Sequence, residues 1–356
     1  AFADAMRPEV PDAMAMATAA GIQTLVVTGD HLETAAAIAT AAGLPPGRAI
    51  TGTELEGLED GTLGRALGEL RIVARAIPEQ KLRLVRLARG LGRTVAVTGD
   101  GVNDAPALQH ADVGVAMGSG TAVARETSDL VLGDDSFGTL MDGLREGRRM
   151  VANVQKGLVF VISTHVALLG FILVATIAGY GQPLLPLQIL WLELFIDLST
   201  SVAFEREPEE PEAMRRPPRP RGELLLGRGL MARIGLAGAF SALAALAVLE
   251  LSPARFEHAR WVAYSALVVG QLVRAYANRS LDQSVLRLPP NALLAAACLA
   301  VLVIQLAIPA VPALATAFHA SPLSAGEWLV VIAIAFLPAA VAEIVRTLRP
   351  GRTWIA

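Results

Sequence analysis

Residues 94–108 read TVAVTGDGVNDAPAL, and this segment is the most informative about the fold. Its β-branched start, TVAV, predicts a short buried strand that ends abruptly at the triplet Thr98-Gly99-Asp100. Asp100 and Asp104, with Asn103 between them, form a group of hard oxygen ligands suited to Mg²⁺. A lone Thr-Gly-Asp triplet is usually a strand-to-turn junction, so the functional interpretation depends on the longer string.

The segments around this stretch predict short strands that alternate with helices. The predicted strands are residues 22–27, 71–75 and 94–97, and the predicted helices are residues 9–20, 34–43 and 81–90. Gly43 is the expected C-cap of the second helix. Such an alternation predicts a parallel sheet covered by helices on both faces, with ligands beyond the carboxyl ends of the strands. Both Thr28-Gly29-Asp30 and Thr98-Gly99-Asp100 fall at such ends.

These strand ends suit a phosphate group. Helices that begin just after them offer free N–H groups to an anion. A carboxylate beside a phosphate repels it unless a cation intervenes, so the acids and a divalent metal are expected together. Lys81, near the start of its helix, is expected to give the transferring phosphoryl group a fixed positive charge. The competing interpretation of Lys81 is ordinary solvated surface.

The sequence resembles the P-type ATPases, which belong to the haloacid-dehalogenase-like phosphotransferases, and within them the type II, calcium-pump-like branch. The resemblance rests on VTGDHLETAAAIA at 27–39, IPEQK at 77–81 and TGDGVNDAPALQHADVGVAMGSGTAVARETSDLVLGDDSF at 98–137. It continues through the apolar half of the chain. It implies an α/β haloacid-dehalogenase-like (Rossmannoid) partial domain at 1–150, followed by an all-α transmembrane bundle of six helices at 151–356.

The resemblance also assigns roles in phosphoryl transfer from ATP. It implies that six residues contact or support the phosphoryl group: Thr28, Gly29, Asp30, Lys81, Asn103 and Asp104. It also implies that Asp100 binds the Mg²⁺ ion and that Asp104 supports this metal site.

One family feature is absent from the sequence. The phosphorylated aspartate of these pumps lies in a DKTGT sequence, and no DKTGT occurs here. The nucleotide-binding domain, the actuator domain and the first four helices are also missing. Residue 1 is Ala with no signal peptide before it. The chain is therefore interpreted as the C-terminal part of a pump, which lacks the N-terminal portion of the same protein and cannot complete its own sheet.

Composition predicts a multi-pass membrane protein. The sequence is 53% hydrophobic and only 18% charged, and the apolar residues concentrate after residue 150. Runs that fit the roughly 20 residues of a membrane span occur at 157–179, 184–204, 229–250, 260–277, 291–315 and 326–346. Arginines gather in the loops 205–228 and 278–290 and in the C-terminal tail. The positive-inside rule therefore predicts that these segments and the soluble half are cytoplasmic, in a bacterial-type plasma membrane.

The net charge and the cysteine content argue against a nucleic-acid-binding protein and against a disulfide-stabilised protein. A net charge of −3 gives no argument for a nucleic-acid partner. The single cysteine, Cys298, excludes a disulfide framework.

The second predicted span carries two acids. Glu193 and Asp197 are four residues apart and share one helix face. Each costs roughly 2.5–3.5 kcal/mol at mid-bilayer, so both are expected to face the bundle interior and a transported cation. The competing interpretation is an interhelical hydrogen bond. By the resemblance, this segment supplies cation ligands in type II pumps.

Other positions depart from the calcium-pump pattern. A ligand Glu of the preceding helix corresponds to Leu168, and His165, one turn earlier, is the alternative ligand. Gln271 replaces another calcium-pump Glu, and Arg274 follows it by three residues. Arg274 either reaches the membrane interface or acts as a built-in counter-charge. With one Glu, one Asp and one His as ligands, a single divalent ion is favoured over two Ca²⁺. Neutral imidazole suits Mn²⁺ better than Ca²⁺, but Ca²⁺ stays the default ion, because type II pumps normally carry it.

Three functions remain open on sequence alone. The first is ATP-driven transport of a cation across a lipid bilayer through an aspartyl-phosphate intermediate. The second is a proton pump, in which an Asp near an Arg changes its protonation. The third is a non-catalytic, truncated membrane protein that acts as a binding or regulatory partner. A membrane-anchored phosphatase of the same superfamily is disfavoured, because the nucleophilic aspartate is absent. The loop 205–228, rich in Pro, Glu and Arg, predicts a solvated linker or a coupling element.

Overall fold

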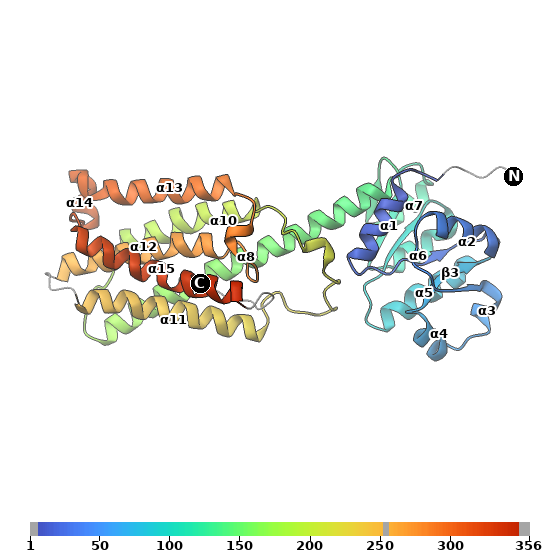
Figure 1. Ribbon diagram of the computed structural model, residues 1–356, viewed down its shortest axis with the longest axis horizontal. Coiled ribbons are helices and arrows are strands. Elements are labelled where there is room, and N and C mark those ends of the chain that lie inside the picture. Colours follow the sequence, from blue (N-terminus) through green and yellow to red (C-terminus); the bar gives the residue numbers. More distant parts are fainter. Residues whose placement is uncertain (1–5, 252–255, 349–356) are drawn as a thin grey trace. The chain divides into compact units, whose positions relative to one another are not determined.

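The computed structural model describes residues 6–251 and 256–348 (Figure 1). The remaining residues, which include Arg349 and Arg352 of the C-terminal tail, lie outside the described part. The chain divides into two compact units. The first contains residues 1–148 and 211–223, and the second contains residues 149–210 and 224–356.

The first unit is an α/β domain with two three-stranded sheets. One sheet has the order β1-β3-β2, and the other has the order β4-β5-β6. Every pairing is parallel. The strands are β1 (Val26–Val27), β2 (Arg48–Thr51), β3 (Leu70–Ala74), β4 (Ala96–Gly99), β5 (Val113–Met117) and β6 (Leu130–Leu132). The predicted parallel pairing is confirmed, but the predicted single sheet is two sheets, because among the described residues β1 and β4 are each paired on one side only.

Seven helices of the described residues surround these strands. They are α1 (Val10–Ala19), α2 (Leu32–Ala41), α3 (Gly52–Glu56), α4 (Asp60–Ala66), α5 (Pro78–Gly90), α6 (Ala105–His110) and α7 (Ala122–Thr127). Gly43 has φ +76° and closes α2 as predicted. Its N–H donates to the Thr40 carbonyl, and the Leu44 N–H donates to the Ala39 carbonyl, which is the Schellman pattern. A core of fully buried leucines and valines, including Leu55, Leu63 and Val73, lies beneath β2 and β3.

The second unit is a bundle of long helices. Its elements are α8 (Phe137–Ile177), α9 (Pro186–Leu190), a π-helical turn (Trp191–Asp197), α10 (Leu198–Glu205), α11 (Arg228–Leu251), α12 (Phe256–Ala277), α13 (Ala292–Ala307), α14 (Pro312–Phe318) and α15 (Ala325–Leu348). The first twelve residues of α8 belong to the first unit. The predicted fifth span, 291–315, is too long, because the helix ends near Pro309 and Pro312 begins the separate helix α14.

Five helices in the described residues are long and apolar enough to cross a membrane, namely Phe137–Ile177, Pro186–Glu205, Arg228–Glu250, Ala292–Ala310 and Ala325–Leu348. The predicted count of six is therefore not confirmed. The fourth predicted span is the helix α12, which carries Arg260, Gln271 and Arg274. It packs against α11, α13 and α15, and most of its side chains are buried (Figure 1). A helix enclosed by protein needs no lipid-facing apolar surface, so its lower hydrophobicity fits its place.

A buried ionic network ties one end of the bundle together. The Arg279 guanidinium contacts Glu207 Oε1 through Nε at 2.9 Å and Nη2 at 2.8 Å, and the two side chains are 1% and 2% exposed. Asn291 Nδ2 donates to Glu207 Oε2 at 2.7 Å, and Asn153 Nδ2 donates to the Glu207 carbonyl at 2.7 Å. This network joins α8, the chain after α10, the end of α12 and the start of α13.

Residues 211–223 pack with the first unit, although the sequence analysis placed them in the transmembrane region. Arg148 donates to the carbonyl oxygens of Ala213 at 2.9 Å and Arg216 at 2.8 Å. Arg221 Nη2 lies 2.9 Å from Asp112 Oδ1. A Cβ at Gly21 would lie 2.9 Å from Pro217 Cα. The prolines and arginines of this loop therefore bind the soluble unit, which a solvated linker would not do.

Candidate phosphoryl and cation sites

The triplet Thr28-Gly29-Asp30 directly follows strand β1. Thr28 Oγ1 lies 3.0 Å from Asp30 Oδ2 and accepts a hydrogen bond from the Asp30 N–H at 3.2 Å. The chain after β3 holds the triplet's backbone, because the Arg75 N–H donates to the Asp30 carbonyl and the Ala76 N–H donates to the Thr28 carbonyl, both at 2.9 Å. Gly29 and Asp30 are exposed to solvent, so a phosphoryl group can approach them.

Asp100 follows strand β4 in the same way. Its carbonyl accepts a hydrogen bond from the Thr121 N–H at 2.8 Å, while Asp100 and Asn103 are exposed. Asp104 ends a short 3₁₀ turn and is more enclosed. Its Oδ1 lies 2.6 Å from Lys81 Nζ, and its Oδ2 accepts from the Gly101 N–H at 3.3 Å. Both Asp104 oxygens are therefore engaged, whereas the Asp100 carboxylate stays accessible.

Residues 75–81 connect the two triplets. Arg75 and Ala76 hold the backbone of the first triplet, and Lys81, on the first turn of α5, contacts the acid that follows the second. The oxygen-only donor set fits Mg²⁺. The accessible Asp100 suits direct ligation, and Asp104 suits a supporting position. Sequence reasoning missed Arg75 and Ala76, because their contribution is made by backbone groups.

His165, Glu193 and Asp197 form a cluster in the bundle. His165 projects from α8, and the two acids project from the π-helical turn. His165 Nε2 lies 2.8 Å from Glu193 Oε2, and His165 Nδ1 lies 3.7 Å from Asp197 Oδ2. One ligand atom of each residue lies within 4.8 Å of those of the other two, which is a spacing that could hold a metal ion.

The His165 ring is oriented by its own helix. Nδ1 lies 2.8 Å from the Val161 carbonyl oxygen, which can only accept a hydrogen bond, so Nδ1 carries the proton. The other nitrogen, Nε2, therefore faces Glu193. Metal-binding histidines commonly donate their second ring nitrogen to a carbonyl in this way.

Asp197 is the enclosed member of the cluster. Its side chain is 9% exposed, against 34% for Glu193 and 40% for His165. Among the described residues, neither Asp197 carboxylate oxygen has a hydrogen-bond partner. An ionised carboxylate in this setting is costly unless a cation offsets it. The π-helical turn that carries both acids is a rare element found frequently at functional sites.

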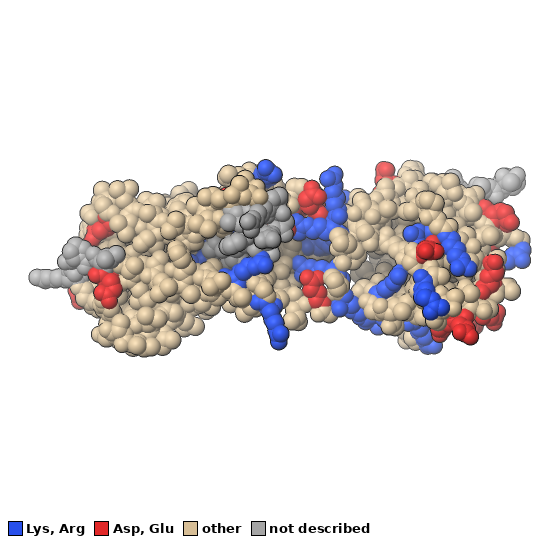
Figure 2. Space-filling view, turned by 60° about the horizontal axis from the view of Figure 1, so that its bottom comes forward, with Lys and Arg blue, Asp and Glu red and all other residues tan. Residues whose placement is uncertain are grey.

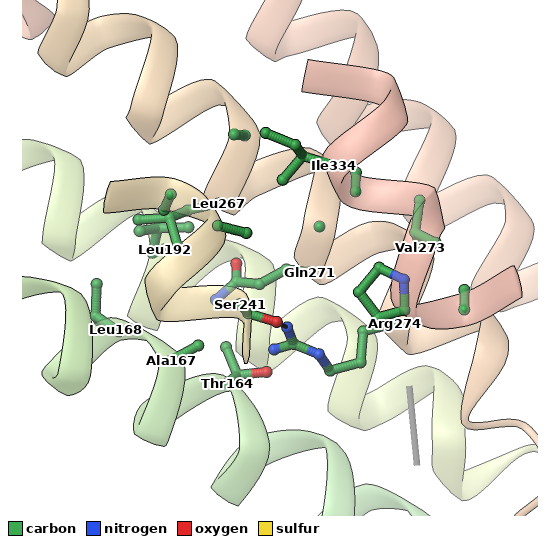
Figure 3. A pocket seen from close by; sticks show the side chains of 17 residues that line it. Thr164, Ala167, Leu168, Leu192, Ser241, Leu267, Gln271, Val273, Arg274 and Ile334 are labelled. Carbon is green, nitrogen blue, oxygen red and sulfur yellow. Dashed lines mark hydrogen bonds between the residues drawn. The ribbon is translucent and has the colours of Figure 1, made fainter. Parts of the chain in front are cut away.

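Gln271, which the sequence suggests as a further cation contact, lies outside this cluster. Gln271 and Leu168 line a small neighbouring cavity between α8, α11, α12 and α15, together with Arg274 (Figure 3). Gln188 has a structural role, because its Nε2 donates to the Phe318 carbonyl at 3.0 Å and its Oε1 accepts from the Leu185 N–H at 3.0 Å. It therefore caps α9 and binds it to α14.

The sequence matches known families over most of its length. The C-terminal region of cation-transporting ATPases matches residues 181–348. Haloacid dehalogenase-like hydrolases match residues 1–112 and, through a second family, residues 86–142.

Named relatives agree with these matches. The chain is 36% identical to a calcium-transporting ATPase of Bacillus subtilis over 94% of its own length, and 34% identical to calcium-transporting ATPase 1 of Bacillus cereus over 96%. It is 37% identical to the probable cation-transporting ATPase F of Mycobacterium bovis over 94%. It spans 38%, 41% and 38% of these relatives, respectively. These similarities lead to one conclusion: the chain belongs to the P-type cation-transporting ATPases.

Proposed function

We propose that the chain provides part of the phosphorylation domain and the cation-binding helices of a pump. The pump uses ATP to move a divalent cation across a membrane through an aspartyl-phosphate intermediate. The observation that carries the proposal is the cluster of His165, Glu193 and Asp197 within an apolar helical bundle. The relatives, which are longer, are named calcium- or cation-transporting ATPases.

The soluble unit is proposed to position the phosphoryl group. Thr28, Gly29 and Asp30 would contact it at the end of β1, and Lys81 would place a positive charge beside it. Asn103 would support the phosphate from the turn after β4. Mg²⁺, held by Asp100 with Asp104 in support, would neutralise phosphoryl oxygens. ATP is the proposed phosphate donor.

The transported ion is proposed to be Ca²⁺ or Mn²⁺. Glu193 and Asp197 supply the hard oxygen ligands that both ions accept. His165 adds an imidazole nitrogen, which favours Mn²⁺. Gln271, which lines the neighbouring cavity, is a further proposed contact for the ion on its path.

The proposed orientation places the soluble unit on the cytoplasmic side. The surface of the helical unit in Figure 2 is largely free of charge, and Lys and Arg gather at one end of it. Arginines also occur within or next to the helix ends: Arg149 lies within α8, Arg206 follows α10, Arg228 begins α11, and Arg287 lies between α12 and α13. By the positive-inside rule this end faces the cytoplasm.

Direct metal binding tests the proposal. The purified chain in lipid nanodiscs is titrated with Mn²⁺, followed by electron paramagnetic resonance, and with radioactive Ca²⁺. We expect saturable binding that Glu193→Gln weakens at least about tenfold, because the ion loses a charged ligand. Glu257→Gln is the control, since the Glu257 side chain on α12 is 73% exposed. Equal binding by both variants would show that Glu193 is not a ligand.

A proton pump is the second candidate. It is favoured by Asp197, which is buried and has no hydrogen-bond partner among the described residues. The titrations separate the two candidates, because a proton pump predicts no saturable binding of either metal.

A further inference from the structure

A small cavity lies within the bundle, between α8, α11, α12 and α15 (Figure 3). Its volume is about 30 Å³, and most of its lining is apolar. Four polar side chains line it, namely Thr164 from α8, Ser241 from α11, and Gln271 and Arg274 from α12. No acid is among the described residues that line it. The cavity is therefore a separate site from the cluster of His165, Glu193 and Asp197, and the only charge in its lining is positive.

Arg274 brings that positive charge to the cavity. The residue is 5% exposed, and an arginine side chain stays protonated in proteins. One hydrogen bond holds it, from Nη2 to the Ser241 hydroxyl, and its Nε is buried without a partner in the described part of the chain (Figure 3). No described carboxylate forms an ion pair with it, because Glu193 and Asp197 contact His165 instead. A buried charge in this state is unfavourable unless an anion lies against it.

Gln271 is a second donor with no partner. Its side chain is 4% exposed and makes no hydrogen bond to a described residue. An amide has two N–H donors besides its oxygen, so Gln271 can donate to an anion and keep the oxygen that is proposed to meet the cation. The Thr164 and Ser241 hydroxyls already donate to helix carbonyls, at 2.8 Å and 3.0 Å respectively. The unused donors of the cavity therefore belong to Arg274 and Gln271.

The volume of the cavity limits what can occupy it. A water molecule needs roughly 10–15 Å³ of such volume, so about 30 Å³ admits one or two particles of that size. Chloride is only slightly larger than a water molecule, whereas sulfate, phosphate and organic carboxylates are several times larger. A water molecule could accept the unused hydrogen bonds but would leave the charge of Arg274 uncompensated. A halide ion meets both requirements.

We propose that this cavity binds one small monovalent anion of halide size, such as chloride, through the guanidinium of Arg274 and the side-chain amide of Gln271. The anion neutralises Arg274 inside the apolar bundle. It thereby stabilises the hydrogen bond from Arg274 to Ser241, which joins α12 to α11. The proposal does not depend on the proposed function, because no transported cation takes part in it.

Chloride binding is measured on the purified chain in lipid nanodiscs without divalent metal. Radiolabelled chloride is titrated at constant ionic strength against gluconate, which is too large for the cavity. We expect saturable binding of a single chloride per chain, with competition by bromide and none by sulfate. Arg274→Gln should weaken chloride binding at least about tenfold, because it removes the charge. Arg260→Gln is the matched control and should bind chloride like the unmodified chain, since Arg260 is equally buried on the same helix but does not line the cavity.

Two measurements on the unmodified chain remain informative if a variant fails to fold. Replacing gluconate with chloride should raise the temperature of thermal unfolding, because a ligand that binds only the folded state stabilises it. The rise should persist in Arg260→Gln and disappear in Arg274→Gln. Anomalous scattering from crystals grown with bromide should locate one ion in contact with Arg274 and Gln271.

Several outcomes would overturn the proposal. The first is no saturable chloride binding by the unmodified chain, which would mean that the cavity holds water only. The others are unchanged chloride affinity in Arg274→Gln, an equal loss in Arg260→Gln, or bromide bound only outside the cavity. The proposed function fails in a different way, because the chain would then bind neither Mn²⁺ nor Ca²⁺, whatever its affinity for chloride.

Discussion

Lys81 Nζ and Asp104 Oδ1 lie 2.6 Å apart, and this ion pair joins helix α5 to the turn that follows strand β4. The two side chains are 22% and 13% exposed, so water screens the pair only in part. The chain just before α5 also holds the backbone of Thr28 and Asp30. A change at Lys81 should therefore affect the geometry of both predicted phosphoryl-binding segments.

Lys81→Ala should lower phosphoenzyme formation about a hundredfold or more in an active pump that contains this sequence. It removes the charge that is proposed to lie beside the phosphoryl group, and it also leaves Asp104 without its ion-pair partner. Transfer of labelled phosphate from ATP measures the effect. Arg83→Ala is the matched control, because Arg83 lies on the same helix and its Asp60 partner is 67% exposed. A similar loss in both variants would indicate damage to α5 as a whole.

Gly99→Ala should reduce phosphorylation by displacing the acid side chain. A Cβ at Gly99 would lie 2.5 Å from Asp104 Cβ, which is closer than such atoms approach. Asp104 must then move away from Lys81. Phosphoenzyme formation is again the measurement, with circular dichroism as a check of folding. At Gly90 an added Cβ meets nothing within 4 Å, so Gly90→Ala should retain activity.

His165→Gln should change metal preference more than it changes overall affinity. The variant replaces a ring nitrogen with an amide, which weakens Mn²⁺ binding and leaves the oxygen ligands for Ca²⁺. The ratio of Mn²⁺ to Ca²⁺ affinity is expected to fall at least about fivefold. Competition binding in nanodiscs measures this ratio. An unchanged ratio would assign His165 to helix packing, in line with its hydrogen bond to Val161.

Asp134→Asn should make the start of α8 less sensitive to acid. Hydrogen bonds from the Thr139 hydroxyl and the Ser136 N–H hold the pKa of Asp134 below its usual value. A carboxyl whose pKa is lowered by folding stabilises the native state above its unfolded pKa and loses that contribution as pH falls through the folded pKa. Protection of amides 136–139 from hydrogen exchange, corrected for intrinsic rates, should therefore decline below about pH 4. The variant should show a weaker decline.

Arg279→Met should strongly destabilise the bundle. The change leaves the Glu207 carboxylate buried without its counter-charge, which costs about 3–5 kcal/mol. Thermal unfolding in detergent measures the loss. Arg287→Met, at an exposed position, should have little effect. The double variant Glu207→Leu/Arg279→Met should recover much of the stability, and a failure to recover it would mean that Arg279 contributes mainly through packing.

Local sequence signals predicted many elements of the soluble unit. The helices α1, α2 and α5 and the strand β3 lie close to where periodicity, Gly43 and Pro78 place them, whereas β4 is shifted from the predicted 94–97 to Ala96–Gly99. The strands β2, β5 and β6 are not among the predicted elements, although β5 is as long as β3. The predicted strand 22–27 is reduced to Val26–Val27, since only these two residues pair with β3.

The cluster of His165, Glu193 and Asp197 was only partly predictable. The four-residue spacing of Glu193 and Asp197 placed both acids on one side, but it gave no sign of the π-helical turn, which has no composition signal. His165 was chosen by family resemblance, and its distance to Glu193 depends on how α8 packs against the π-helical turn.

Residues 211–223 change how the two units are joined. Because this loop packs with the soluble unit, the chain passes between the units three times, near residues 148, 210 and 223. A single connection would act as a swivel, about which a domain can rotate freely. Three connections allow the domain to bend but oppose its rotation, because rotation would twist the three connecting chain segments around one another. In a pump with these three connections, we expect the soluble unit to act on the helical unit by tilting and by pulling on the connecting segments. Cleavage of the loop near residue 210 should weaken this mechanical coupling while both units stay folded.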